Sequence, residues 1–140
     1  MANGTIAFDT LSTSGQITGT AKSVDTDYVV NGSAKAWVNF NGTGTIATRD
    51  SFNTASLTDG GTGDYVLNFS NVMSDANYSV TGSSSVLIGS FETMFVPNFK
   101  PPGTETASTT SAFQFAVLRP STTQPYDVPY VYVQVHGDLA

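Results

Sequence analysis

Alternation of apolar and polar residues with a period of two dominates the chain and predicts β-strands. The clearest cases are "AKAWVNF" (34–40), "DYVLNF" (64–69), "AFQFAVL" (112–118) and "YVYVQVH" (130–136). Weaker strand patterns are "TIAF", "DYVV", "SFNTASL", "NYSVTG", "SVLIG" and "ETMFVPNF". No window carries a sustained apolar stripe with the 3.6-residue period of a helix. The chain is therefore predicted to be all-β.

Turn-forming residues separate these segments and limit the architecture. Asn-Gly pairs follow the strand patterns at 31–32 and 41–42, and a Pro-Pro-Gly turn lies at 101–103. The simplest arrangement is an antiparallel β-sandwich or jelly-roll-like domain of about eight to ten short strands. The 140 residues suit one such domain, predicted at 21–140. Residues 1–20 are polar with few apolar anchors, so we predict an N-terminal arm or attachment segment that uses Ile6, Phe8 and Leu11.

Composition and charge exclude several classes of partner. The formal net charge is −6, and the basic residues are scattered along the chain: Lys22, Lys35, Arg49, Lys100 and Arg119. Nucleic-acid binding needs clustered positive charge, so it is not expected. No apolar run approaches the length of a membrane span, and the N-terminus lacks the pattern of a secretory signal. We expect a protein made in a cytoplasm, without membrane insertion and, having no Cys, without disulfides.

The glycine-rich stretch "SLTDGGTGDYVLNF" (56–69) is the strongest candidate for a ligand loop. The calcium repeat G-G-x-G-x-D needs an Asp two positions after the third Gly, but Asp64 follows Gly63 directly. An EF-hand loop counted from Asp59 has Ser70 where a Glu is required. A phosphate loop needs a Lys and a following helix, and a strand pattern follows instead. We predict a hairpin turn of positive-φ residues, with no metal and no cofactor.

Catalytic chemistry has few candidates in this sequence. His136 is the single histidine, and no G-x-S-x-G motif accompanies it. Asp25 and Asp27 are predicted to alternate on one face of a strand, while Glu92 and Glu105 are the only glutamates. A catalytic acid needs burial to raise its pKa, and most of these acids fall in turn sequences. We therefore expect no catalytic residues and no enzyme; a small polysaccharide-degrading enzyme is the weakest of the functional alternatives.

Half of the chain resembles a known family. The matching segments are the strand at 34–40, "DSFN" (50–53), the turn and strand at 59–69, and Met73 with "DANY" (75–78). In this order and spacing, residues 31–80 resemble a module of tail-fibre and related virion proteins from tailed bacteriophages, including phages of marine bacteria and cyanobacteria. The ending "VYVQVHGDL" is similar to that module's last strand. The resemblance implies an all-β fold, a homotrimer and a location on the virion, with no catalytic residues to transfer.

Aromatic residues and loops suggest where such a protein would make contact. Trp37, Tyr126, Tyr130 and Tyr132 fall on faces that a monomer would leave exposed, and a ring of identical subunits could cover them. The loop 119–130 carries prolines and tyrosines, which suit a recognition surface or, alternatively, a rigid connector.

Two functional hypotheses follow, each with its own working residues. A tail-fibre or fibre-tip protein would touch a host surface glycan or outer-membrane protein through Tyr126, Tyr130, Trp37 and Lys100. A capsid-decoration, head-fibre or other virion-assembly protein would instead dock onto neighbouring virion proteins through its first twenty residues.

Overall fold

The computed structural model describes residues 15–18, 23–85, 93–101 and 103–140. The chain divides into two compact units, residues 1–33 and 34–140, and each is described by itself. The predicted boundary between residues 20 and 21 lies outside the described residues and stays a prediction.

The first unit is small and has no core of its own among its described residues. Strand β1 (Gln16–Thr18) pairs antiparallel with β2 (Ser23–Asp25), and helix α1 (Thr26–Gly32) follows directly. Asp25 caps the helix, because its Oδ1 accepts a 3.0 Å hydrogen bond from the Asp27 backbone N–H. No residue of α1 is buried.

The strand predicted at "DYVV" is therefore wrong, and so is the predicted alternation of Asp25 and Asp27 on one strand face. The N-cap hydrogen bond starts a helix at Thr26 although the sequence has no helical apolar stripe.

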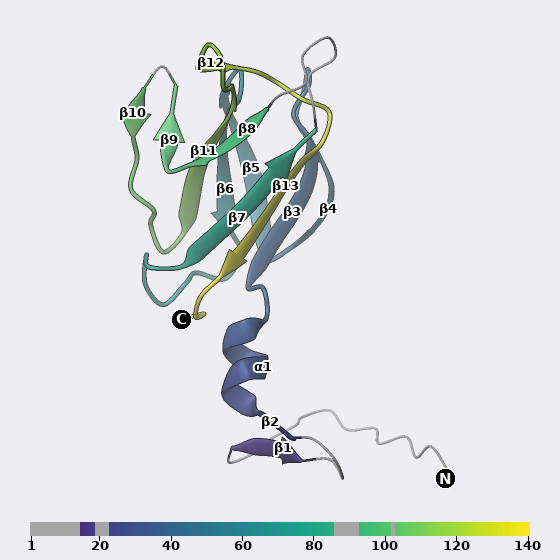
Figure 1. The fold of residues 1–140 in the computed structure, drawn as a ribbon, viewed down its shortest axis with the longest axis vertical. Coiled ribbons are helices and arrows are strands. Elements are labelled where there is room, and N and C mark those ends of the chain that lie inside the picture. Colours follow the sequence, from purple (N-terminus) through teal and green to yellow (C-terminus); the bar gives the residue numbers. More distant parts are fainter. Residues whose placement is uncertain (1–14, 19–22, 86–92, 102) are drawn as a thin grey trace, which may run out of the picture. The chain divides into compact units, whose positions relative to one another are not determined.

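The second unit is a β-sandwich, which confirms the predicted all-β class (Figure 1). Its four-stranded sheet has the order β4 (Ala47–Phe52), β3 (Ala36–Asn41), β13 (Val131–His136) and β7 (Ser79–Ser84). The five-stranded sheet consists of β5 (Thr54–Gly61), β6 (Asp64–Phe69), β11 (Ala112–Arg119), β8 (Met94–Pro97) and β12 (Gln124–Pro125). All pairs are antiparallel. A two-stranded hairpin, β9 (Phe99–Lys100) and β10 (Thr104–Glu105), adjoins β11.

The core lies between the two sheets and is built from the alternating residues that the sequence indicated. The four-stranded sheet contributes Ala36, Val38, Phe40, Val131, Val133 and Val135; the five-stranded sheet contributes Tyr65, Leu67, Phe69, Phe113, Phe115 and Val117. Across the sheets, the Phe40 ring packs edge-on against Tyr65, with centroids 5.0 Å apart, and against Phe115 at 6.2 Å. The four clearest strand predictions are thus confirmed, and their alternating apolar residues face the core; in β11, Ala116 and Leu118 on the other face are buried as well.

The segment "SFNTASL", predicted as one strand, belongs to two strands, because the chain leaves one sheet and enters the other inside it. Strand β4 ends at Phe52, β5 begins at Thr54, and Asn53 between them has a φ of 52°. Its side chain donates to the Asn71 carbonyl at 3.0 Å and accepts from the Asn71 N–H at 2.6 Å. These two bonds hold a left-handed residue in place, since Asn tolerates that conformation better than most side chains.

Candidate functional site

The four predicted contact residues separate into two groups. Trp37 lies in β3 and Tyr130 directly precedes β13, so both belong to the four-stranded sheet. Tyr126 follows β12, where its backbone N–H donates to the Val117 carbonyl at 3.0 Å, and Lys100 ends β9; both belong to the other side of the sandwich. The predicted attachment residues, Ile6, Phe8 and Leu11, lie outside the described residues.

The four-stranded sheet turns one face away from the core, and its side chains form two cross-strand rows. Inward positions of β3 and β13 are buried, so the intervening positions point outward. One row consists of Phe52, Trp37, Gln134 and Thr81. The next row consists of Asp50, Asn39, Tyr132 and Ser83. These residues, together with Arg49 and Tyr130, are called the outer face below.

Arg49 and Tyr130 extend the outer face beyond the second row. A bulge between Asn39 and Phe40 shifts the β3–β4 register and leaves Arg49 without a direct pairing partner. The Arg49 guanidinium carbon lies 4.2 Å from the centroid of the Tyr130 ring, and Nη1 lies 3.5 Å from Asn39 Oδ1. The cation is therefore engaged with neighbours on the face, and it holds the Tyr130 ring in position.

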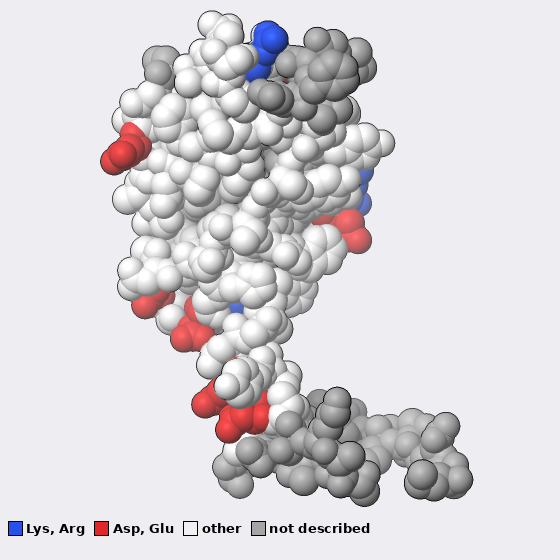
Figure 2. Space-filling view, in the orientation of Figure 1, with Lys and Arg blue, Asp and Glu red and all other residues white. Residues whose placement is uncertain are grey.

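Several aromatic rings of the outer face are open to solvent. Phe52 is 53% exposed, Tyr130 46% and Tyr132 44%, while Trp37 is partly buried. Within the rows, the Gln134 amide lies beside Trp37, and Tyr132 lies between Asn39 and Ser83. Figure 2 shows the middle of this side of the sandwich without Lys, Arg, Asp or Glu side chains.

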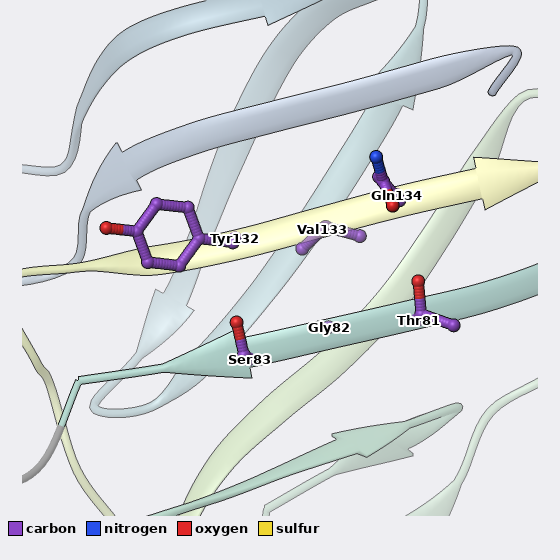
Figure 3. A pocket seen from close by; sticks show the side chains of 6 residues that line it. All are labelled: Thr81, Gly82, Ser83, Tyr132, Val133 and Gln134. Atoms are coloured by element: carbon purple, nitrogen blue, oxygen red, sulfur yellow. The ribbon is translucent and has the colours of Figure 1, made fainter.

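A shallow depression lies on the outer face between β7 and β13. Its volume is about 230 Å³, and it is lined by Thr81, Gly82, Ser83, Tyr132, Val133 and Gln134 (Figure 3). The paired residues Gly82 and Val133 form its floor. Gly82 is required there, because a Cβ would lie 2.6 Å from the Phe95 ring on the inner side of β7.

The glycine-rich stretch contains the turn of the β5–β6 hairpin, so the predicted hairpin turn is confirmed. Gly61 and Gly63 have φ values of 121° and 63°, as positive-φ turn residues do. The groups of this turn point into the protein: the Gly63 N–H donates to Asp127 Oδ1 at 2.7 Å, and Asp64 Oδ1 accepts from Gln114 at 2.7 Å. Among the described residues, no cluster of three or more His, Asp or Glu could hold a metal ion.

Asp127 also accepts a 2.8 Å hydrogen bond from the hydroxyl of Tyr65, which is buried in the core. Burial raises the pKa of Tyr65 above its ordinary value, and the hydrogen bond to Asp127 and the nearby carboxylates raise it further. The same hydroxyl lies 3.2 Å from the Gly42 carbonyl, and the Gly42 N–H donates to the Val128 carbonyl at 3.0 Å. Three turns at one end of the sandwich are thus joined around one phenol.

The catalytic candidates are not gathered into a site. His136 ends β13 opposite Ser79, Glu105 is exposed on β10, and Asp25 and Asp27 belong to the first unit. Glu92 lies outside the described residues.

Sequence reasoning missed Phe52, Gln134 and Thr81 as members of the outer face. The alternation in "YVYVQVH" could have indicated Gln134. Phe52 and Thr81 become members only through their pairing with Trp37 and Gln134, which the sequence does not show.

Helices long and apolar enough to cross a membrane do not occur in the described parts of the chain. Comparison with protein-family models, with curated proteins and with solved structures finds no match.

Proposed function

We propose that the protein is a bacteriophage virion structural protein, a tail-fibre or fibre-tip component that contacts the host cell surface. The observation that carries the proposal is the outer face, where exposed rings lie in the same rows as hydrogen-bonding side chains, on a sheet fixed by a packed core. Such rings supply contact area at a small entropic cost, because a Tyr or Trp side chain has only two rotatable bonds. The resemblance of residues 31–80 to a phage fibre module supports the same role.

The proposed role is binding without catalysis, and it needs neither catalytic residues nor a cofactor. The protein would be made in the host cytoplasm and then take its place on the virion. Its partners would be other virion proteins, further copies of itself in a homotrimer, and a glycan or outer-membrane protein of the host. Strands β4 and β5 would lie at the contacts between copies. In the described part of the chain, each of them forms one edge of its sheet.

Binding of the labelled, purified protein to host cells tests this function. We expect Tyr130→Ala to weaken cell binding, because it removes a ring of the outer face, and Tyr126→Ala to leave it nearly unchanged. Tyr28→Ala is the matched control, since Tyr28 is 77% exposed and belongs to the first unit. Equal binding by all three variants would show that the outer face is not the contact surface.

A second candidate function, capsid decoration or another virion-assembly role, is favoured by helix α1. Its side chains Tyr28, Val29 and Val30 are 77%, 48% and 56% exposed, and no residue of the helix is buried. A seven-residue helix gains little stability by itself, so a docked neighbour would stabilise it. Electron microscopy of virions with the labelled protein decides between the roles: a position at the fibre end supports the first, and regular positions over the head support the second.

A further inference from the structure

We infer that the outer face binds an uncharged carbohydrate chain that lies across strands β3, β13 and β7. This inference rests on the proposed function and names the ligand class of the same surface. A pyranose ring has an apolar face of C–H groups and a rim of hydroxyls, so it needs an aromatic platform with polar groups beside it. Both rows of the outer face supply that combination.

The order of side chains within the rows fits this chemistry closely. In the first row the neighbouring Phe52 and Trp37 rings are followed by the Gln134 amide. In the second row Tyr132 lies between Asn39 and Ser83. Successive outward positions are about 6.8 Å apart along a strand, so polar groups of one row lie within reach of a sugar stacked on the other.

The charge of the outer face favours a neutral ligand over an anionic one. Its cation, Arg49, already faces Tyr130 and Asn39, and Asp50 beside it carries the opposite charge. The middle of the face carries no charged side chains (Figure 2), and the whole protein has a net charge of −6. A polyanion would meet no cation in the middle of the face, whereas a neutral chain needs none.

A protein partner fits the same face less well. The centre of a stable protein interface is a contiguous apolar patch that excludes water. Here Gln134 and Asn39 lie between the rings of the two rows, so a flat apolar partner would leave their amides without hydrogen bonds.

The depression between β7 and β13 indicates how large a part of the ligand it can hold. Its volume of about 230 Å³ is below the roughly 300–1,000 Å³ of pockets that enclose a drug-sized molecule. It would take one ring of a longer chain, with the Thr81 and Ser83 hydroxyls on one side and Tyr132 and Gln134 on the other (Figure 3). Neighbouring rings of the chain would then stack on Trp37.

Trp37 gives the test a built-in probe, because it is the single tryptophan of the chain. Its fluorescence is followed while soluble neutral polysaccharides, namely glucans and galactans of several linkages, are titrated into the full-length protein. A polyuronate of similar length is the anionic comparison. We expect a saturable change with at least one neutral polymer and none with the polyuronate.

Two substitutions on the outer face, compared with a control elsewhere, test where the polysaccharide binds. Tyr132→Ala should weaken it by about tenfold, the effect of one lost stacking contact. Gln134→Ala should weaken it less, and Tyr28→Ala should leave it unchanged. Thermal unfolding of each variant checks the fold, which should hold because Tyr132 and Gln134 point outward from β13. Unaltered binding by Tyr132→Ala, or preference for the polyuronate, would overturn the inference.

Cell experiments separate this inference from the function on which it rests. If periodate, which cleaves sugar diols, abolishes cell binding and protease treatment does not, the carbohydrate ligand is supported. The reverse pattern keeps the host-contact function and rejects the carbohydrate in favour of a surface protein. If Tyr132→Ala instead splits a homotrimer, a second copy of the chain covers the face and the inference fails.

Discussion

The Tyr65 hydroxyl donates a 2.8 Å hydrogen bond to Oδ1 of Asp127, a residue 62 positions later in the chain. This bond fastens the segment before β13 to the β5–β6 hairpin, whose Gly63 N–H donates to the same oxygen. Because Tyr130 and β13 lie only a few residues after Asp127, the bond also helps to fix where one edge of the outer face begins.

Removing the Tyr65 hydroxyl should destabilise the sandwich. We expect Tyr65→Phe to lower the free energy of unfolding by about 1–3 kcal/mol, because Asp127 loses a donor in a partly buried place. Chemical denaturation measures the change. Tyr132→Phe is the control, expected within about 0.5 kcal/mol of the parent protein because its ring is exposed. Equal effects of the two substitutions would show that the Tyr65–Asp127 bond contributes nothing.

Alkaline pH should destabilise the protein through the same phenol. The pKa of Tyr65 is raised in the folded state, so above its ordinary value of about 10 the unfolded chain loses a proton that the folded one keeps. The contribution is fully present below pH of about 10 and decreases as pH rises, by about 1.4 kcal/mol per pH unit.

Unfolding free energies between pH 8 and about 11.5 check this expectation. The Tyr65→Phe variant should show a shallower decline than the parent protein. Some decline should remain in the variant, because burial also raises the pKa of Tyr78. Identical slopes for the variant and the parent protein would contradict the assignment to Tyr65.

Gly63 should tolerate alanine less well than Gly44, although the two backbones are alike. Their φ values are 63° and 64°, so alanine brings a similar penalty of about 1–2 kcal/mol at either position. A Cβ at Gly44 would meet nothing within 4 Å, but at Gly63 it would lie 2.6 Å from the Val117 carbonyl oxygen. We expect Gly63→Ala to cost about 1–3 kcal/mol more in unfolding free energy. A difference near zero would mean that the turn shifts freely.

Asn53 should be more sensitive than Asn98 to the loss of its amide. Both residues have a φ of 52°, but the Asn53 side chain makes two bonds to the Asn71 backbone, whereas Asn98 accepts one from Ser108. Asn53→Ala should therefore lower the free energy of unfolding by about 1 kcal/mol more than Asn98→Ala. Asn53→Gly, which relieves the backbone strain alone, should recover only part of the loss. Full recovery with Gly would show that the two bonds are dispensable.

Much of the sandwich core could be predicted from the sequence, because a half-buried strand records its buried face in alternate residues. The alternation of Val131, Val133 and Val135 is an example, since it needs no knowledge of the partner strands. The crossing at Asn53 could not be predicted, because its conformation depends on Asn71, eighteen residues later. Helix α1 could not be predicted for a different reason: it buries no residue, so its sequence carries no apolar pattern with a helical period.

Only some residues of the outer face could be predicted from the sequence. Trp37 and Tyr130 are visible as outward aromatic residues in the alternation of single strands. Their neighbourhood depends on the pairing of β3 with β13 and on the bulge that brings Arg49 to Tyr130. Tyr126 and Lys100 were also predicted from the sequence as contact residues. The fold instead places them on the opposite side of the sandwich, away from the outer face.

The place of β3 within its sheet also has a mechanical consequence. Any pulling force that reaches the sandwich through residues 1–33 enters beside the start of β3, an inner strand that pairs with both β4 and β13. The hydrogen bonds on both sides of β3 lie across its axis, so a load along that axis is borne by them together in shear and they do not open one by one. Rupture under force follows the barrier to unfolding. If the protein holds a virion against a moving cell, as proposed, a tether at this strand would resist rupture.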